Sequence, residues 1–120
     1  MKSYFAGTVL GALAELTGLK IRSNGKLLDW TRDPVEVYAF HVNTPAGAKS
    51  VDIEFQFTSP VLGSEGRIVV TPAMMNVQWE QVSFYPAGHF TRAIQVQPSI
   101  TLPKTWTGVA SLDGAKTAGN

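Results

Sequence analysis

The feature that most constrains the fold is a period of two in hydrophobicity within short segments. It is clearest at residues 50–57, SVDIEFQF, where every second side chain is apolar: Val51, Ile53, Phe55 and Phe57. Successive side chains of a β-strand point to opposite faces, so this segment predicts a strand with one buried and one solvated face. Residues 93–102, AIQVQPSITL, alternate in the same way, and Pro98 inside them indicates an edge strand or a bulge.

Further segments have the composition of short strands and are separated by turn signals. Asn24-Gly25 supplies the positive φ angles of a two-residue hairpin turn between two of them. The others are VEVYAFHV, RIVVT, VQWEQVSFY and TGVASL, which begin at residues 35, 67, 77 and 107. Strands at intervals of about 8–12 residues predict an all-β fold, an antiparallel β-sandwich of about seven to nine strands.

The two ends of the chain stand apart from this pattern. Residues 1–15 combine an early lysine with a mildly apolar run that carries two glycines. We favour an opening segment of the fold with one short helix over residues 9–16, and the alternative is a weak signal-like stretch. The β domain proper is expected at residues 16–112, followed by a polar tail at 113–120.

Composition excludes several classes of function. With 44% hydrophobic and 16% charged residues, a chain of 120 residues is enough for one core and too short for two. The ten basic residues are scattered and the net charge is +1, so no nucleic-acid partner is expected. Because there is no cysteine, disulfides and cysteine zinc sites are excluded. No apolar run reaches the roughly 18–20 residues of a transmembrane segment, and the compartment stays open between cytoplasm and periplasm.

No catalytic or metal-ligating set is visible in the sequence. The two histidines, His41 and His89, lack a second histidine or a carboxylate at helical spacing. We interpret His41 as hydrogen-bonded in or beside the core, and His89 as an exposed turn residue. Asp52 and Glu54 are assigned to the solvated face of one strand, and Asp33 to the cap of a turn. There is also no nucleophile elbow and no phosphate-binding glycine loop.

Three long segments resemble one family. They are LTGLKIRSNGKLLDWTRDPVEVYAFHVNTPAG, GRIVVTPAMMNVQWEQVSFYPAGHFTRAIQVQPSITLP and TWTGVASL, within residues 16–112. They are similar to the N-terminal domain of the glycyl aminopeptidase family of zinc metallopeptidases, metallopeptidase family sixty-one. The resemblance implies a three-part enzyme, in which a thermolysin-like zinc domain and a PDZ-like domain follow the β domain. Members have further N-terminal strands where this chain has residues 1–15.

The zinc ligands and catalytic base of that family match no position in this chain. We therefore expect no catalytic residue, metal site or cofactor here, zinc only in the catalytic domain, and no peptidase activity from this chain alone. The resemblance implies that the chain packs on the catalytic domain as its partner and helps to shape the substrate cleft. The candidate interface residues are Trp79, Tyr85, His89, Phe90 and Arg92.

Other interpretations stay open at this stage. The chain could be a standalone module that binds a peptide or a carbohydrate, although aromatic residues on strands more often pack in a core or an interface. Exposed sheet edges could pair with another copy to form a homo-oligomer. An excised domain, a truncated gene product and a standalone module are all compatible with these residues.

Overall fold

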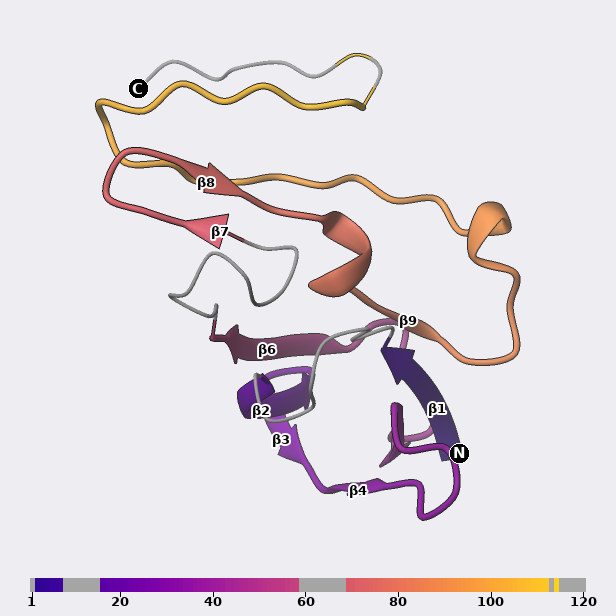
Figure 1. Ribbon diagram of the computed structural model, residues 1–120. Helices are drawn as coiled ribbons and strands as arrows, with labels where there is room; N and C mark the ends of the chain where they lie inside the picture. Colours follow the sequence, from indigo (N-terminus) through magenta and orange to yellow (C-terminus); the bar gives the residue numbers. More distant parts are fainter. Residues whose placement is uncertain (1, 8–15, 59–68, 113, 115–120) are drawn as a thin grey trace.

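The computed structural model describes residues 2–7, 16–58, 69–112 and 114, in which every strand pair is antiparallel (Figure 1). The strands are Lys2–Gly7 (β1), Leu16–Ser23 (β2), Lys26–Leu28 (β3), Trp30–Arg32 (β4), Ala39–Asn43 (β5), Asp52–Phe57 (β6), Val69–Val70 (β7), Met75–Asn76 (β8) and Phe84–Pro86 (β9). They form sheets of order β4-β5-β1-β9, β3-β2-β6 and β7-β8. The predicted all-β antiparallel fold is confirmed, and closure into a complete sandwich stays a prediction.

The two larger sheets meet through a small buried core. Ile21, Phe40 and Val42 are each only 1% exposed. Phe84 links the two sheets, because its ring centroid lies 5.7 Å from that of Phe40 and 5.0 Å from that of Phe55 in β6. Both contacts are edge-to-face, the arrangement that aromatic rings favour. The core therefore rests on a few large side chains.

A second tie between the sheets comes from the tryptophan of β4. The Trp30 ring packs edge-on against Phe40, with 5.5 Å between the ring centroids. Its indole Nε1–H donates to the backbone carbonyl oxygen of Leu19 in β2 at 3.3 Å. This side chain thus buries its apolar part and still satisfies its polar group, as buried tryptophans usually do.

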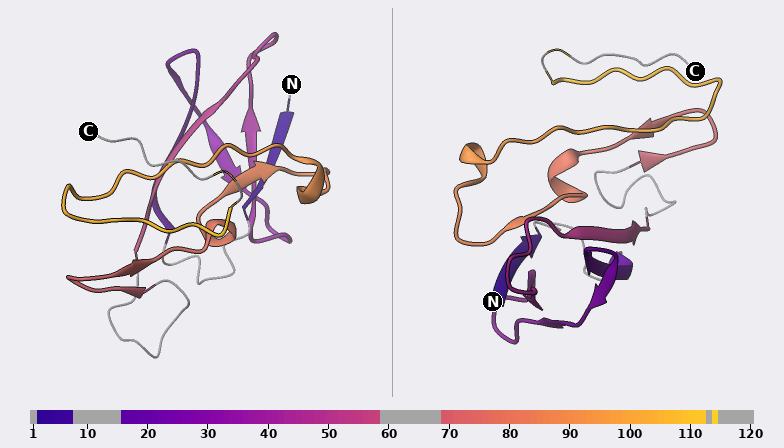
Figure 2. Two further views of the ribbon diagram at one scale, coloured as in Figure 1. Left: turned by 90° about the horizontal axis from the view of Figure 1, so that it is seen from above. Right: turned by 180° about the vertical axis from the view of Figure 1, so that it is seen from behind.

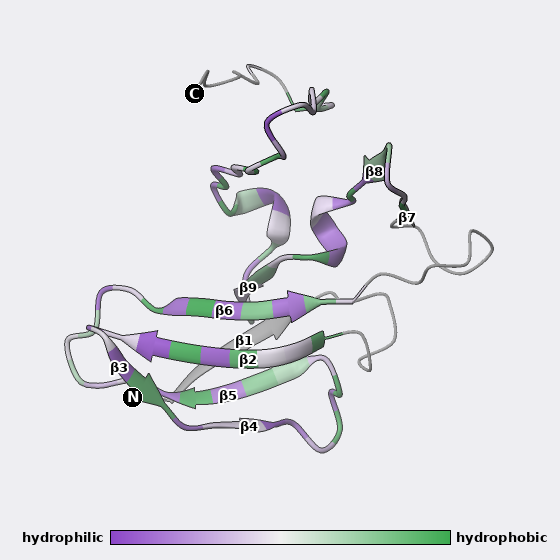
Figure 3. Cartoon of the chain, turned by 90° about the vertical axis from the view of Figure 1, so that its left-hand side faces the viewer, coloured by the Kyte–Doolittle hydropathy of each residue, from purple (hydrophilic) through white to green (hydrophobic). Residues whose placement is uncertain are grey.

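The β2-β3 hairpin and β6 form as the sequence predicts. Asn24 and Gly25 have φ angles of 49° and 76°, and Ser23 pairs with Lys26 across the two-residue loop. Positive φ at both loop positions is the signature of the type I′ turn, whose twist matches that of the strands. Along β6, exposed and half-buried side chains alternate, and Figure 3 shows the same alternation in hydropathy.

The strand predicted from residue 35 begins only at Ala39. The Asp33 Oδ1 atom accepts hydrogen bonds from the backbone N–H groups of Val35 and Glu36, both at 2.8 Å. The Asp33 N–H donates to the carbonyl oxygen of Ala39 at 2.9 Å. An aspartate that satisfies nearby backbone donors in this way competes with strand pairing, so residues 33–38 turn instead of extending.

The largest difference from the sequence interpretation lies at the N-terminus. Residues Lys2–Gly7, part of the divergent opening segment at 1–15 where no strand was predicted, form β1 between β5 and β9 in the four-stranded sheet. Their pairing with β5 runs from Lys2 opposite Asn43 to Ala6 opposite Ala39. The expected helix over residues 9–16 lies outside the described residues, apart from Leu16, which opens β2.

In the C-terminal third, the alternating sequence overestimates the strand content. Residues 77–85 form a 3-10 helix, Trp79–Gln81 (η2), and then the short β9. A second 3-10 helix, Thr91–Ala93 (η3), follows. Residues 94–112, which we call the C-terminal arm, contain no strand; they run extended beyond the sheets and fold back on themselves (Figures 1 and 2). The strands predicted at 93–102 and 107–112 are therefore corrected to unpaired extended chain.

Candidate functional site

The C-terminal arm is an uncovered apolar part of the molecule. Val96 and Ile100 are 73% and 49% exposed. After Ile94, the one backbone hydrogen bond of the arm within the described residues runs from the Trp106 N–H to the Pro103 carbonyl oxygen, at 2.9 Å. An extended segment with open backbone groups and apolar side chains is suited to pairing with another chain.

The two ends of the first extended run are less exposed than its middle. Ile94, Leu102 and Trp106 are half-buried, in contrast to the residues between Ile94 and Leu102. A Cβ atom placed on Gly108 would lie only 2.9 Å from Cδ1 of Leu102, so the return of the chain passes close to this leucine. The first run of the arm is thus partly covered at its ends and open in its middle.

The five predicted interface residues occupy different settings. Trp79 is half-buried in η2 and Tyr85 is half-buried in β9, whereas His89, Phe90 and Arg92 are exposed on the segment that leads into the arm. The structure brings two of them together: the Arg92 guanidinium lies 5.2 Å from the centroid of the Phe90 ring. An interface role for all five stays a prediction.

Sequence reasoning missed the arm as a surface. It assigned residues 93–102 to a paired strand because their side chains alternate. Alternation predicts which side chains share a face of a sheet, but it does not show which neighbouring strand pairs with them. Pro98, which cannot donate to a sheet ladder, indicated an edge position and did not reveal that the segment has no strand partner.

The outer face of the four-stranded sheet carries an ordered polar pair. His41 Nε2 and Asp33 Oδ2 are 2.7 Å apart, and their side chains are 28% and 25% exposed. Hydrogen bonds from the backbone N–H groups of Glu36 and Val35, and then that from His41, lower the pKa of the Asp33 carboxyl to about 2. The carboxylate therefore stays charged at neutral pH, caps the 33–38 turn and fixes the imidazole. The predicted turn cap at Asp33 and the predicted hydrogen bond of His41 are confirmed, and His41 makes its bond on the outer face of the sheet instead of in the core.

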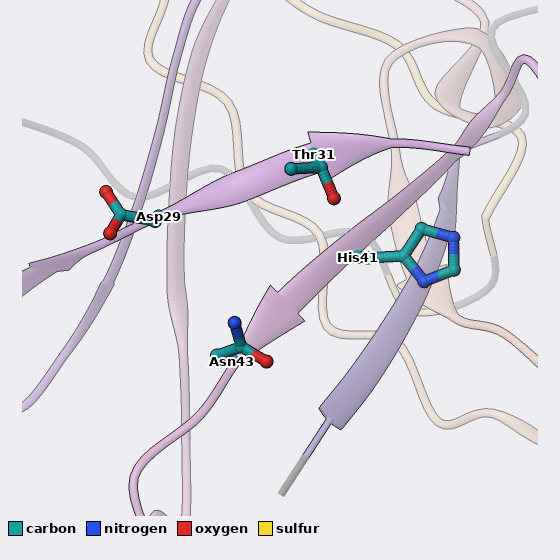
Figure 4. A pocket seen from close by; sticks show the side chains of 4 residues that line it. All are labelled: Asp29, Thr31, His41 and Asn43. Atoms are coloured by element: carbon teal, nitrogen blue, oxygen red, sulfur yellow. The ribbon is translucent and has the colours of Figure 1, made fainter. Parts of the chain in front are cut away.

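A shallow hollow of about 200 Å³ lies beside this pair, lined by Asp29, Thr31, His41 and Asn43 (Figure 4). Thr31 lies opposite His41 in the β4-β5 ladder. These side chains alternate with the core-facing Trp30 and Val42, and so point away from the core. Within the described residues, no group of three His, Asp or Glu side chains could hold a metal ion.

Both carboxylates predicted on the solvated face of β6, Asp52 and Glu54, are exposed, and Glu54 belongs to a surface ion-pair network. Glu54 accepts a hydrogen bond from Arg22 at 2.8 Å and lies 3.6 Å from the Lys20 ammonium. The hydrogen bond from Arg22, and then the charge of Lys20, lower the pKa of Glu54. These groups tie β2 to β6 and are accounted for without catalysis.

Fold and surface together define a class: an antiparallel β domain that leaves an apolar arm uncovered. The described residues include no helix with the length and apolarity that a membrane crossing requires. The chain matches the family described as Peptidase M61 N-terminal domain over residues 8–120, and it belongs to that family. No curated protein matches the chain. The family match confirms the resemblance found in the three long sequence segments.

Proposed function

We propose that this chain is the non-catalytic N-terminal β domain of a glycyl-aminopeptidase-like zinc metallopeptidase. In this role it packs on the catalytic domain and helps to wall the substrate cleft. The family match supports the assignment to a peptidase. The uncovered arm is the observation that supports docking on another domain, because it leaves apolar side chains in water that a neighbouring surface would cover.

The energetic case rests on the exposed apolar residues of the arm. Fully burying a side chain such as Val96 or Ile100 stabilises a complex by about 1.5–3 kcal/mol, and both are largely exposed. The radius of gyration, 16.1 Å, also exceeds the value of about 13.6 Å expected for a compact domain of this length. The chain thus has surface to contribute to a larger assembly.

The segment that leads into the arm extends the same surface. Phe90 is 75% exposed, and Arg92 lies against its ring. Aromatic residues, phenylalanine included, and arginine are enriched at protein interfaces relative to the rest of the surface. We therefore place the docking surface on residues 88–112, with Phe90 as its most prominent aromatic side chain.

An activity assay tests the peptidase role. The chain alone, supplied with zinc and a glycyl substrate, is expected to show no turnover. The catalytic part of a peptidase of this family, purified separately, is expected to gain activity or stability when the chain is added. Turnover by the chain alone that a chelator abolishes would refute the non-catalytic role.

Paired surface variants locate the docking face. Phe90→Ser is expected to weaken binding to the catalytic part by about tenfold or more, in line with loss of an aromatic anchor. Leu27→Ser is the matched control, since Leu27 is 66% exposed on β3 and lies outside the proposed surface. Equal affinities for the two variants in a titration would remove Phe90 from the interface.

A further inference from the structure

The first run of the arm has a mirror-symmetric sequence pattern. Residues 94–102 read IQVQPSITL, with Pro98 in the middle. Moving outward from Pro98, the residues match in class on both sides: Gln97 with Ser99, Val96 with Ile100, Gln95 with Thr101, and Ile94 with Leu102. Because the partner in an antiparallel pair runs in the opposite direction, such a segment is complementary to a second copy of itself.

The middle of this segment is accessible for pairing. Residues 95–101 are all exposed. Within the described part of the chain, none of them takes part in a backbone hydrogen bond. Residues 94–102 also contain no charged side chain, so two copies of the segment can approach without repulsion between like charges inside it.

Pro98 selects the edge through which a pair would form. In an extended strand, the N–H and C=O groups of alternate residues point to the same edge. The edge that carries Gln95, Gln97, Ser99 and Thr101 keeps every donor, whereas the opposite edge lacks the donor of Pro98. Pairing through the complete edge puts Pro98 at a position that makes no ladder hydrogen bond, where its missing N–H costs nothing.

We propose that residues 94–102 pair antiparallel with the same residues of a second copy of this chain, about a twofold axis at Pro98. The four residues of the complete edge in each copy then exchange about eight backbone hydrogen bonds. Val96 lies opposite Ile100 of the second copy, and all apolar side chains share one face. The contact is isologous and closes at a dimer.

The dimer is expected to be weak and concentration-dependent. A two-stranded ribbon alone is only marginally stable in water. Here Ile94 and Leu102, at the two ends of the segment, are already half-buried, and partial ordering before pairing lowers the entropy cost of forming the strand. The pair uses the backbone edge of the arm and does not depend on the catalytic domain proposed above.

Cysteine cross-linking tests the register in the full chain. Since the chain has no cysteine, introduced thiols have no background. Position 98 alone faces itself in the proposed pair, so Pro98→Cys brings two thiols within reach of a disulfide. Thr101→Cys is the matched control, because its thiol would face Gln95. Under mild oxidation, Pro98→Cys is expected to give a covalent dimer at least about tenfold faster than the control.

A pair of charge variants tests the same register without cross-linking. Val96→Glu and Ile100→Lys should each be monomeric alone, because each sets a charge opposite an apolar side chain at two symmetric positions. In a mixture, the new carboxylate meets the new ammonium, while the native Ile100 and Val96 still meet at the other position. Sedimentation velocity is expected to show a dimer only in the mixture.

Three results would overturn the proposal. The first is a wild-type chain that stays monomeric at the highest attainable concentration. The second is an equal cross-linking rate for Pro98→Cys and Thr101→Cys, which removes the twofold axis at Pro98. The third is a mixture of the two charge variants that associates no more than either alone. None of these measurements involves a peptidase, so they are independent of the test of the proposed function.

Discussion

Strand β6 and the first run of the arm have the same alternating sequence and different structures. Residues Asp52–Phe57 pair with β2, and their apolar side chains turn toward the core. Residues 94–102 alternate as regularly and have no strand partner within the described chain. The comparison shows that alternation specifies the face of a strand, whereas the edge it pairs with depends on what the rest of the chain brings alongside.

Ion pairs across the ladder help to set the register of β6 on β2. Arg22 and Lys20 on β2 meet Glu54 on β6. Exposed ion pairs of this kind contribute little each, about 0.2–1 kcal/mol. Their position across the ladder still favours one register over its neighbours. The arm contains no charged residue between Ile94 and Leu102 that could do the same.

Truncation of an aromatic side chain should give the largest difference in stability between the core and the segment beside the arm. Phe40→Ala is expected to lower the free energy of unfolding by about 3–5 kcal/mol, because it leaves a cavity among the rings of Trp30 and Phe84. Phe90→Ala, beside the arm, is expected to change it by no more than about 0.5 kcal/mol. Urea denaturation followed by tryptophan fluorescence measures both. Similar losses would mean that the arm is part of the cooperative core.

Two glycine substitutions should distinguish the regions by a smaller difference in stability. Gly25→Ala puts a side chain at φ 76° in the β2-β3 turn and is expected to cost roughly 1–2 kcal/mol of stability. Gly108→Ala meets only the side-chain end of Leu102, at 2.9 Å, and should cost less because that side chain can shift. A larger loss from Gly108→Ala in the same denaturation assay would contradict this order.

Lowering the pH should reduce the stability of the sheets and leave the C-terminal arm unaffected. The pKa of Asp33 is lowered from 3.8 to about 2 in the folded chain. Its contribution to stability is therefore present above about pH 4 and is lost as the pH falls toward 2. Asp33→Asn is expected to be less stable at neutral pH and to lack that part of the acid transition in denaturation curves measured from pH 5 to pH 2. An unchanged acid transition would exclude the role of this carboxylate.

The smallest expected effect is tighter dimerisation through the arm. Arg92 and Lys104 each lie two residues beyond an end of the proposed 94–102 pair, so their like charges flank both ends of the ribbon and oppose pairing. Arg92→Glu should tighten the dimer a few-fold, since an exposed ion pair contributes about 0.2–1 kcal/mol. Lys49→Glu makes the same change in net charge at an exposed residue outside the arm and serves as the control. If sedimentation equilibrium shows equal gains in dimer affinity for the two variants, the cause is the change in net charge and not the proposed register.

Several parts of the fold and of the candidate site were predictable from short segments. Asn24-Gly25 predicted the hairpin, and the alternation of residues 50–57 predicted the two faces of β6. Asp33 before Pro34 predicted the turn, although its consequence, the late start of β5 at Ala39, needed the hydrogen-bond geometry. Each success depends on chemistry within a few residues along the chain.

The sequence by itself determined the all-β class, the turn positions, the absence of cysteine chemistry and the family. Only the tertiary structure decided that Lys2–Gly7 is an interior strand between β5 and β9, and that residues 94–112 remain unpaired. The physical reason is the same in both cases. Side-chain period and turn chemistry are local properties, whereas strand pairing joins residues far apart in the chain and depends on which edges the whole fold leaves open.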